Sequence, residues 1–294
     1  MHPLVVAGSA SGPFAERLAR ELGGAGAKPV ATECKRFPDG EGYVRLLADV
    51  KGRDVVVAQA TAPDHNLVEL LLWLDAAREA GARSVTAAIP YLGYARQDRV
   101  FQPGEAISSR AVARAMASGC DRVITVDPHK EEVLQFFGGK AISVSAVPQL
   151  AATLGSWGVD AILAPDKGAR ERAERAAKQL RVGVDHLEKT RLSATEVRMK
   201  PKELDVRGKR VAILDDLIAS GATMLTAAKQ LKQQGATAVY AAATHGLFTG
   251  NALPGLLSGG IDRILVTDTW LPGPCSCDLV SAAPAVAGAL KLVA

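Results

Sequence analysis

Several kinds of residue are scarce in this 294-residue sequence, and each shortage narrows what the protein can be. Aromatic residues make up 4% of the chain, and four cysteines stand at positions 34, 120, 275 and 277. Cysteines so few and so scattered do not form a disulfide framework, and the single residue between Cys275 and Cys277 is not the usual spacing of a structural zinc site. A reducing, cytoplasmic setting fits this usage best.

Long apolar runs and a strong excess of one charge are also missing. No stretch approaches the length of a membrane span, and the opening MHPLVVAGSASGPF lacks the charged leader of a secretory signal. The 35 Lys and Arg residues against 31 Asp and Glu residues leave a formal charge of +4, which is too mild to indicate nucleic-acid binding. We therefore expect no membrane and no nucleic acid as partners, whereas small anions remain candidates.

What the sequence does contain is an alternation of short apolar runs with longer amphipathic stretches. Eight runs have the length and composition of buried strands: 4–8, 54–60, 84–90, 121–127, 160–165, 210–216, 238–245 and 262–269. Nearly continuous apolar strands separated by helices indicate an α/β fold with mostly parallel sheets covered on both faces. The alternation starts afresh near residues 142–148, so the predicted domains are 1–145 and 146–294.

Two adjacent acids, Asp215 and Asp216, close one predicted strand and precede a turn of small residues at 219–223. In open parallel sheets, ligands bind beyond the carboxyl ends of the strands. Small residues let backbone N–H groups approach an anion, and the N-terminus of the next helix adds partial positive charge. The acids accept hydrogen bonds from hydroxyl groups. A phosphorylated sugar suits both halves of the motif; the alternative is a strand with an acidic cap before a helix.

This stretch resembles the phosphoribosyl-diphosphate-binding motif of type I phosphoribosyltransferase folds, with Ser220 for the first Thr and Ala222 for the second Gly. An alanine fits position 222 only with a negative φ. Further segments, in order, are similar to the ribose-phosphate pyrophosphokinase family: RFPDGEGYVRL, IPYLGYARQDR, VDPHKEEVLQFF and LAPDKGARERA. PDKGA, LEKTRLSATEV and ARQDRVFQPGEAIS are closest to the archaeal-type branch of that family.

The resemblance implies a fold, a reaction and partners. It implies two type I phosphoribosyltransferase-like domains, each a mostly parallel sheet flanked by helices. It further implies transfer of the diphosphate of ATP to the anomeric hydroxyl of ribose 5-phosphate, with Mg²⁺ as cofactor and a homo-oligomer built from dimers. Oligomer size, control by ADP or inorganic phosphate, and the preferred nucleotide donor stay open.

The resemblance also assigns roles to residues. The expected ATP contacts are Phe37, Asp39, Glu41, Arg96 and Gln97, of which the first three would reach the nucleotide site of a neighbouring subunit. The expected metal-associated residues are His129 and Asp166. Lys189 and Arg191 would act in catalysis from a mobile loop or hairpin. The expected ribose 5-phosphate contacts are Arg191, Asp215, Asp216, Ala219, Ser220, Gly221, Ala222 and Thr223.

Other interpretations of these residues stay open at this point. Without the flanking motifs, PDG is an ordinary turn, His129 can be a structural histidine, and the basic stretch around Lys189 can be a solvated hairpin. A non-catalytic regulatory subunit of the synthetase would keep the fold, and the altered turn at 220 and 222 is the feature in its favour. A phosphoribosyltransferase acting on a nucleobase would not need the FPDGE and ARQDR segments.

Overall fold

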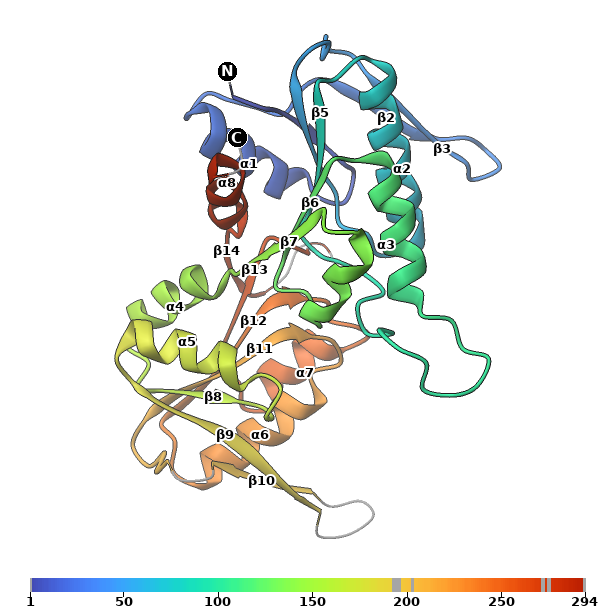
Figure 1. Cartoon of the computed structure of the whole chain (residues 1–294). Coiled ribbons are helices and arrows are strands. Elements are labelled where there is room, and N and C mark those ends of the chain that lie inside the picture. The colour runs from blue at the N-terminus through green and yellow to red at the C-terminus, as the bar shows by residue number, and fades with distance from the viewer. Residues whose placement is uncertain (1, 192–196, 202–203, 271–272, 274–275, 293–294) are drawn as a thin grey trace. The chain divides into compact units, whose positions relative to one another are not determined.

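The computed structural model divides the chain into two compact units, which are described separately (Figure 1). It describes residues 2–191, 197–201, 204–270, 273 and 276–292, with side chains omitted for 188–203. The first unit comprises 1–145, 268–270 and 281–294, and the second comprises 146–267 and 271–280. One junction therefore falls between residues 145 and 146. The last helix belongs to the first unit, however, and not to a continuous 146–294 domain.

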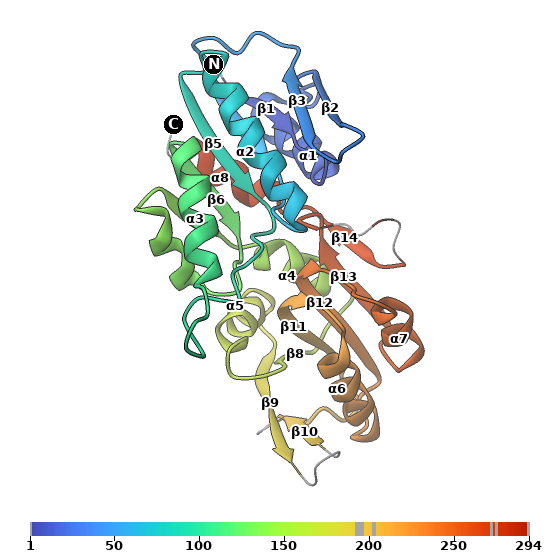
Figure 2. The same cartoon turned by 90° about the vertical axis from the view of Figure 1, so that its right-hand side faces the viewer.

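The first unit is built on a five-stranded sheet in which every pairing is parallel. Its strands, in spatial order, are β1 (Leu4–Ala7), β4 (Asp54–Ala58), β5 (Ser84–Ile89), β6 (Arg122–Val126) and β7 (Ala141–Val144). Its helices are α1 (Gly12–Gly23), α2 (Asp64–Glu79), α3 (Ser108–Gly119), the short 3-10 helix η1 (Glu131–Phe137) and α8 (Ala283–Leu292). Helices α2 and α3 cover one face, and α1 and α8 pack together on the other (Figures 1 and 2).

A two-stranded antiparallel hairpin, β2 (Thr32–Arg36) and β3 (Gly42–Leu46), completes the first unit. Its residues are mostly half-buried or exposed, and β3 packs against α2. Because the hairpin does not carry a continuous apolar run, the strand pattern in the sequence did not reveal it.

The second unit has a seven-stranded sheet in which only one pairing, β9 with β10, is antiparallel among the described strands. Its strands, in spatial order, are β10 (Val197–Pro201), β9 (Gly183–Arg191), β8 (Ala161–Ala164), β11 (Arg210–Ile218), β12 (Ala238–Gly246), β13 (Arg263–Thr267) and β14 (Asp278–Val280). Its helices are α4 (Val147–Ser156), α5 (Arg170–Leu180), α6 (Ala222–Gln233) and α7 (Ala252–Ser258).

Strand β11 shows why these sequences are apolar almost throughout. Val211 and Ile213 pack in the core beneath α6 and α7, whereas Ala212 and Leu214 pack in the core beneath α4 and α5. Successive strand residues point to opposite faces, so a sheet covered on both sides needs apolar side chains at every position. The structure thus confirms the predicted fold class of mostly parallel sheets flanked by helices.

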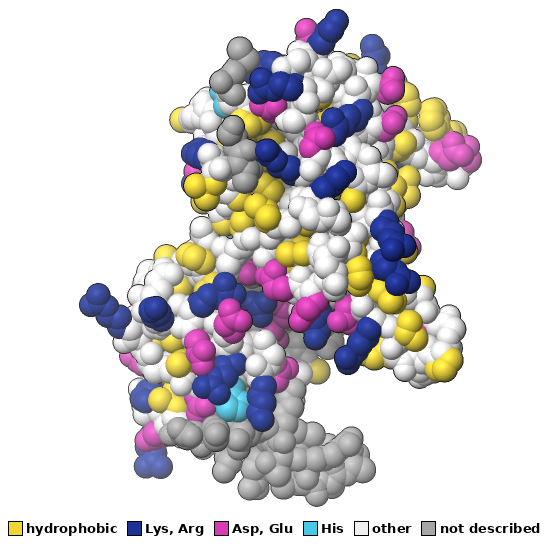
Figure 3. Space-filling view, in the orientation of Figure 1, with side chains coloured by type: hydrophobic (Ala, Val, Ile, Leu, Met, Phe, Trp, Pro, Cys, Tyr) yellow, Lys and Arg dark blue, Asp and Glu magenta, His cyan; other side chains and the backbone are white. Residues whose placement is uncertain are grey.

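The surface and the cysteines complete the description. No helix among the described residues is both long and apolar enough to cross a membrane. On the face shown in Figure 3, the described Lys and Arg side chains are interspersed with Asp and Glu and form no continuous basic stripe. Cys34 and Cys120 are free thiols, and Cys277 is disulfide-bonded, which the sequence pattern did not predict.

Candidate active site

The acidic pair lies inside the last part of β11, in the second unit. Asp216 is buried, with 6% of its surface exposed, and Asp215 is half-buried. An oxygen of Asp215, Oδ1, accepts a hydrogen bond of 2.8 Å from the Asp216 backbone N–H. Burial, together with the neighbouring charge of Asp216, raises the pKa of Asp215 to about 8. A ligand that donates hydrogen bonds here would therefore favour the charged form of Asp215.

The turn after β11 has the backbone that anion binding needs. Gly221, which caps α6, has φ +72° and ψ −1°. A Cβ at this position would lie 2.9 Å from a methyl carbon of Leu256, so both conformation and space require glycine. Ala222 is the first residue of α6 and is not among the residues with positive φ, so it meets the backbone condition set by the sequence.

The N-terminus of α6 is open. No side chain caps it with a hydrogen bond, and Ser220, Ala222 and Thr223 are exposed. The first-turn N–H groups of a helix have no partner within the helix and carry partial positive charge. The segment from Ala219 to Thr223 can therefore bind a phosphate through its backbone.

Asp166 follows β8, which is the neighbour of β11 in the sheet. Its Oδ1 accepts hydrogen bonds from the backbone N–H groups of Gly168, at 2.9 Å, and Ala169, at 3.2 Å. The side chain is exposed, and its second oxygen has no hydrogen bond within the described part of the chain. Because parallel neighbours end at the same edge, the structure brings Asp166 to the edge that carries Asp215 and Asp216.

Arg172, in the first turns of α5, is a residue that the sequence analysis did not identify. Its charge lowers the pKa of Asp215, although by less than burial and Asp216 raise it. Its Nε is buried without a hydrogen-bond partner in the described structure. In the sequence it is one of several arginines in an amphipathic stretch, and only the packing of α5 against β11 distinguishes it.

Lys189 and Arg191 belong to the β9–β10 hairpin. In the antiparallel register, Lys189 is opposite Met199, and Arg191 is opposite Val197. Their side chains lie outside the described part of the structure, so the catalytic roles assigned to them remain predictions.

In the first unit, Arg96 and Gln97 lie in the long segment between β5 and α3, and His129 follows β6. Arg96 and His129 are exposed, and Gln97 is half-buried. Before His129, buried Asp127 has φ +36°, an uncommon value for a residue other than glycine, and its N–H donates to the Val144 carbonyl. This conformation redirects the chain at the carboxyl end of β6.

Phe37, Asp39 and Glu41 lie in or beside the turn of the β2–β3 hairpin. Phe37 is 44% exposed and packs edge-on against Tyr43, with 5.8 Å between ring centroids. An oxygen of Asp39 accepts a 3.1 Å hydrogen bond from the Glu41 backbone N–H, and Gly40 takes φ +94°. The predicted turn is therefore present, with an exposed aromatic ring beside two acids.

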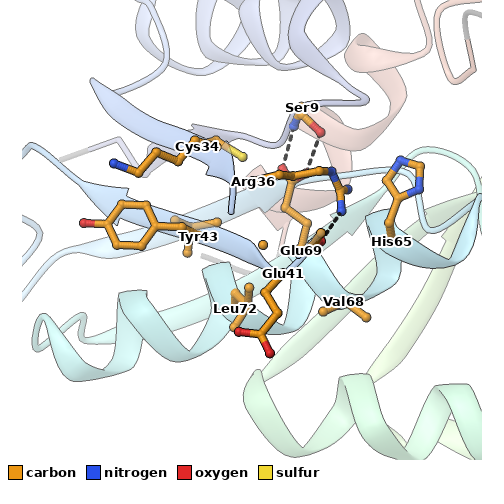
Figure 4. Close-up of a pocket in the computed structure, with 13 residues that line it drawn as sticks. Ser9, Cys34, Arg36, Glu41, Tyr43, His65, Val68, Glu69 and Leu72 are labelled. Carbon is orange, nitrogen blue, oxygen red and sulfur yellow. Dashed lines mark hydrogen bonds between the residues drawn. The ribbon is translucent and has the colours of Figure 1, made fainter. Parts of the chain in front are cut away.

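A cavity of about 670 Å³ lies between this hairpin and α2 (Figure 4). Glu41 lines it, whereas Phe37 and Asp39 do not. On the α2 side, buried Glu69 accepts hydrogen bonds from Ser9 N, Ser9 Oγ and Trp73 Nε1, at 2.8, 2.5 and 3.1 Å. Both Glu69 oxygens are thus occupied, and the carboxylate ties the turn after β1 to α2.

The donor groups fit Mg²⁺ better than a metal held by a protein cage. Within the described ranges, no group of three or more His, Cys, Asp or Glu side chains could hold a metal ion. Mg²⁺ commonly keeps several waters and binds one or two carboxylates together with substrate phosphates. The second carboxylate oxygen of Asp166 suits such a role.

Two α/β units with helix-covered parallel sheets, one carrying an acidic pair before a phosphate-binding turn, define a protein with phosphoribosyltransferase-type domains. Residues 146–254 match the model of the phosphoribosyl transferase domain, and residues 4–119 match that of the N-terminal domain of ribose phosphate pyrophosphokinase. The chain belongs to the ribose-phosphate pyrophosphokinase family, as the ordered motifs predicted.

Individual relatives agree with this assignment. The ribose-phosphate pyrophosphokinase of Methanopyrus kandleri is 46% identical over 98% of both chains. That of Methanosarcina acetivorans is 39% identical over 98% of this chain and 99% of its own. The crystal structure of phosphoribosylpyrophosphate synthetase from Mycobacterium smegmatis superimposes with a TM-score of 0.85 at 30% identity, covering 100% of this chain and 99% of the other.

Proposed function

We propose that this protein is a ribose-phosphate diphosphokinase. It transfers the diphosphate of ATP to the anomeric hydroxyl of ribose 5-phosphate and yields 5-phosphoribosyl 1-diphosphate and AMP. Family membership supports the reaction, and the observation that carries it is the acidic pair of β11 directly before an uncapped helix N-terminus. This arrangement offers hydroxyl acceptors and a phosphate cradle within one strand–turn–helix unit.

In this proposal the second unit holds the sugar. Asp215 and Asp216 accept hydrogen bonds from the ribose hydroxyls, and the backbone of residues 219–223 holds the 5-phosphate. Raising the pKa of Asp215 to about 8 costs the free protein stability, which hydroxyl donors would restore. The acids therefore favour a hydroxyl-rich ligand over a second phosphate.

The nucleotide is assigned to the first-unit segments. Arg96 contacts phosphate oxygens through its guanidinium, Gln97 contacts the nucleotide, and Phe37, Asp39 and Glu41 contact the adenine of a neighbouring subunit. Asp166 and His129 are each assigned to Mg²⁺, which would neutralise phosphate charge when bound. The protein is proposed to act in the cytoplasm as a homo-oligomer built from dimers.

Lys189 and Arg191 are assigned to the transferring group. As the anomeric oxygen bonds to the β-phosphorus and the bond to the α-phosphate oxygen breaks, negative charge builds on the phosphoryl oxygens. An ammonium and a guanidinium on a hairpin are suited to stabilise that charge. Their place on β9, which pairs with β8, supports a position at the same sheet as Asp166 and Asp215.

The non-catalytic alternative loses its main support. It rested on the altered turn, yet Ala222 takes the helical conformation and Gly221 keeps the position that requires positive φ. A turn that still presents its N–H groups gives no reason to expect lost chemistry.

The test is AMP release by purified protein given Mg²⁺, ATP and ribose 5-phosphate, beside Lys189→Ala. We expect AMP that depends on the sugar and falls by roughly 10²-fold or more in the variant, because a donor that stabilises transition-state charge is typically worth that much. Sugar-independent AMP, or none from well-folded protein, would reject the proposal. Equal turnover by the variant would reject the role of Lys189.

A further inference from the structure

Gln97 is fixed in place from both its backbone and its side chain. Its N–H donates to the Tyr94 carbonyl at 3.3 Å, and its carbonyl accepts from Ser109 N and Oγ at 3.2 and 2.9 Å. Its amide nitrogen, Nε2, lies 3.2 Å from the Arg99 carbonyl and 3.1 Å from Glu105 Oε2. Both hydrogens of the side-chain amide therefore have acceptors.

Glu105 stabilises the loop that contains the acceptors of the Gln97 amide. The same oxygen, Oε2, also accepts from the backbone N–H groups of Phe101, at 2.7 Å, and Gln102, at 2.9 Å. The guanidinium of Arg99 lies 5.0 Å from the centre of the Phe101 ring, which adds a second contact across the same loop. One carboxylate oxygen thus collects three hydrogen bonds from residues three to eight positions earlier.

These contacts determine which end of the Gln97 amide is left for another partner. A carbonyl oxygen and a carboxylate oxygen are acceptors only, so the group between them must be the NH₂ and not the amide oxygen. Both side-chain N–H groups of Gln97 are already hydrogen-bonded, whereas its Oε1 makes no hydrogen bond in the described structure. What Gln97 offers a ligand is an acceptor.

We propose that Gln97 recognises an N–H or O–H group of the bound nucleotide through Oε1, and that Glu105 is the positioning residue that enforces this orientation. The inference rests on the proposed nucleotide site at Arg96 and Gln97 and deepens it by assigning the polarity of one contact. Two groups of ATP have the required chemistry: the 6-amino group of adenine and the ribose hydroxyls. A ring carbonyl in place of the amino group would meet an acceptor and be rejected.

Equilibrium binding of nucleotides, measured by isothermal titration calorimetry in the presence of Mg²⁺, tests this assignment. The probes are ATP, the triphosphate of purine riboside, which lacks the 6-amino group, and 2′-deoxy- and 3′-deoxy-ATP, each lacking one hydroxyl. The wild type should bind one of these analogues about tenfold or more weakly than ATP, because an acceptor left unpaired costs roughly 1–3 kcal/mol. The analogue that weakens binding identifies the donor.

Variants of Glu105 test whether this residue orients the Gln97 amide or only stabilises the fold. In Glu105→Ala, the Gln97 amide is free to rotate and present its NH₂ instead, so the ratio of analogue Kd to ATP Kd should fall to about threefold or less. Glu105→Gln keeps an oxygen that can accept the same three hydrogen bonds, and should keep most of the discrimination. Glu79→Ala, an exposed glutamate at the end of α2, is the matched control and should match the wild type.

Hydrogen exchange checks that Glu105 acts where the contacts place it. A peptide containing Phe101 and Gln102 should exchange faster in Glu105→Ala than in the wild type. An unchanged exchange rate, an unchanged Kd ratio in Glu105→Ala, or a wild type that binds every analogue as well as ATP would each overturn the inference. Protein that binds ATP with the expected discrimination but forms no sugar-dependent AMP would reject only the proposed reaction.

Discussion

Two carboxylates, one in each unit, are used in opposite ways. Glu105, an exposed residue, accepts hydrogen bonds from Gln102 N, Phe101 N and Gln97 Nε2, and these hydrogen bonds lower its pKa. Asp215, half-buried beside another acid, has its pKa raised to about 8. The hydrogen-bond donors to Glu105 come from its own loop. The hydrogen bond that Asp215 accepts from the Asp216 backbone does not offset the effect of burial on its pKa.

This difference in pKa distinguishes a carboxylate that stabilises a loop, Glu105, from one that a ligand could stabilise, Asp215. A carboxylate whose donors come from its own loop stabilises the fold and leaves little to offer a substrate. One that is desolvated and short of donors costs stability in the free protein, and ligand hydroxyls can compensate for it. The two segments proposed to bind substrates also differ in construction: the turn at 219–223 depends on backbone conformation, and the loop at 96–105 depends on side-chain hydrogen bonds.

The largest expected effect tests whether the turn at 219–223 depends on its backbone conformation. Gly221→Ala forces an alanine into φ +72° with its Cβ 2.9 Å from Leu256, which should lower the free energy of unfolding by about 2–3 kcal/mol. Chemical denaturation measures it. Gly250→Ala is the matched control, because that glycine has φ +61° but nothing within 4 Å. A loss no larger than in the control would show that Leu256 does not confine the turn.

The next prediction concerns Asp215. Asp215→Asn should lower kcat/KM for ribose 5-phosphate about 10- to 100-fold, since hydrogen bonds to a charged group contribute roughly 1.5–3 kcal/mol, and should change kcat/KM for ATP far less at saturating sugar. Steady-state kinetics with each substrate varied in turn measures both. Asp205→Asn removes an exposed carboxyl of the same unit and should leave both unchanged. Equal losses for the two substrates would contradict the division between sugar and nucleotide residues.

A further prediction compares the two carboxylates directly through pH. Because the folded pKa of Asp215 lies above its unfolded value of 3.8, its contribution to stability is present at low pH and is lost as pH rises towards 8. Asp215→Asn removes that loss, so its stability relative to the wild type should improve progressively as the pH rises from 5 to 9. Thermal unfolding across this range measures the trend.

Glu105→Gln provides the opposite case. The pKa of Glu105 is lowered from 4.5, so the stability it contributes is present above that value and is lost only as pH falls below it. Between pH 5 and pH 9 the difference from the wild type should therefore be constant. The proposed difference between the two carboxylates would be wrong if the stability of Glu105→Gln relative to the wild type changed with pH, or if that of Asp215→Asn did not.

The sequence predicted most of the fold because apolar strands of covered sheets leave a continuous signal. All eight predicted strands are present, with bounds within a few residues, such as β5 at Ser84–Ile89 for the predicted 84–90. Strands β14 and β7 were missed because both are short edge strands with partly exposed residues, whereas the four-residue strand β8 is buried throughout. The hairpin β2–β3 was missed because neither strand forms a continuous apolar run.

The site was predicted unevenly for a similar reason. Asp215, Asp216 and Gly221 lie close together in the sequence, and their strand–turn–helix context is local, so this context could be predicted before the fold was known, whereas their ligand contacts remain proposals. Glu105 lies eight residues from Gln97 within a Pro- and Gly-containing segment, and only the folded loop shows that they meet. Arg172 was missed because charge alone does not tell which face of a helix turns towards a buried acid.

The return of the chain to its first unit affects the order in which the protein can be completed during synthesis. The second unit needs residues up to 280, whereas the first needs α8, whose packing partner α1 is translated before the whole of the second unit. The domain begun first is therefore the domain finished last. Until α8 is released, one face of the first unit's parallel sheet carries an incomplete cover, so the first unit depends on residues translated after the second unit.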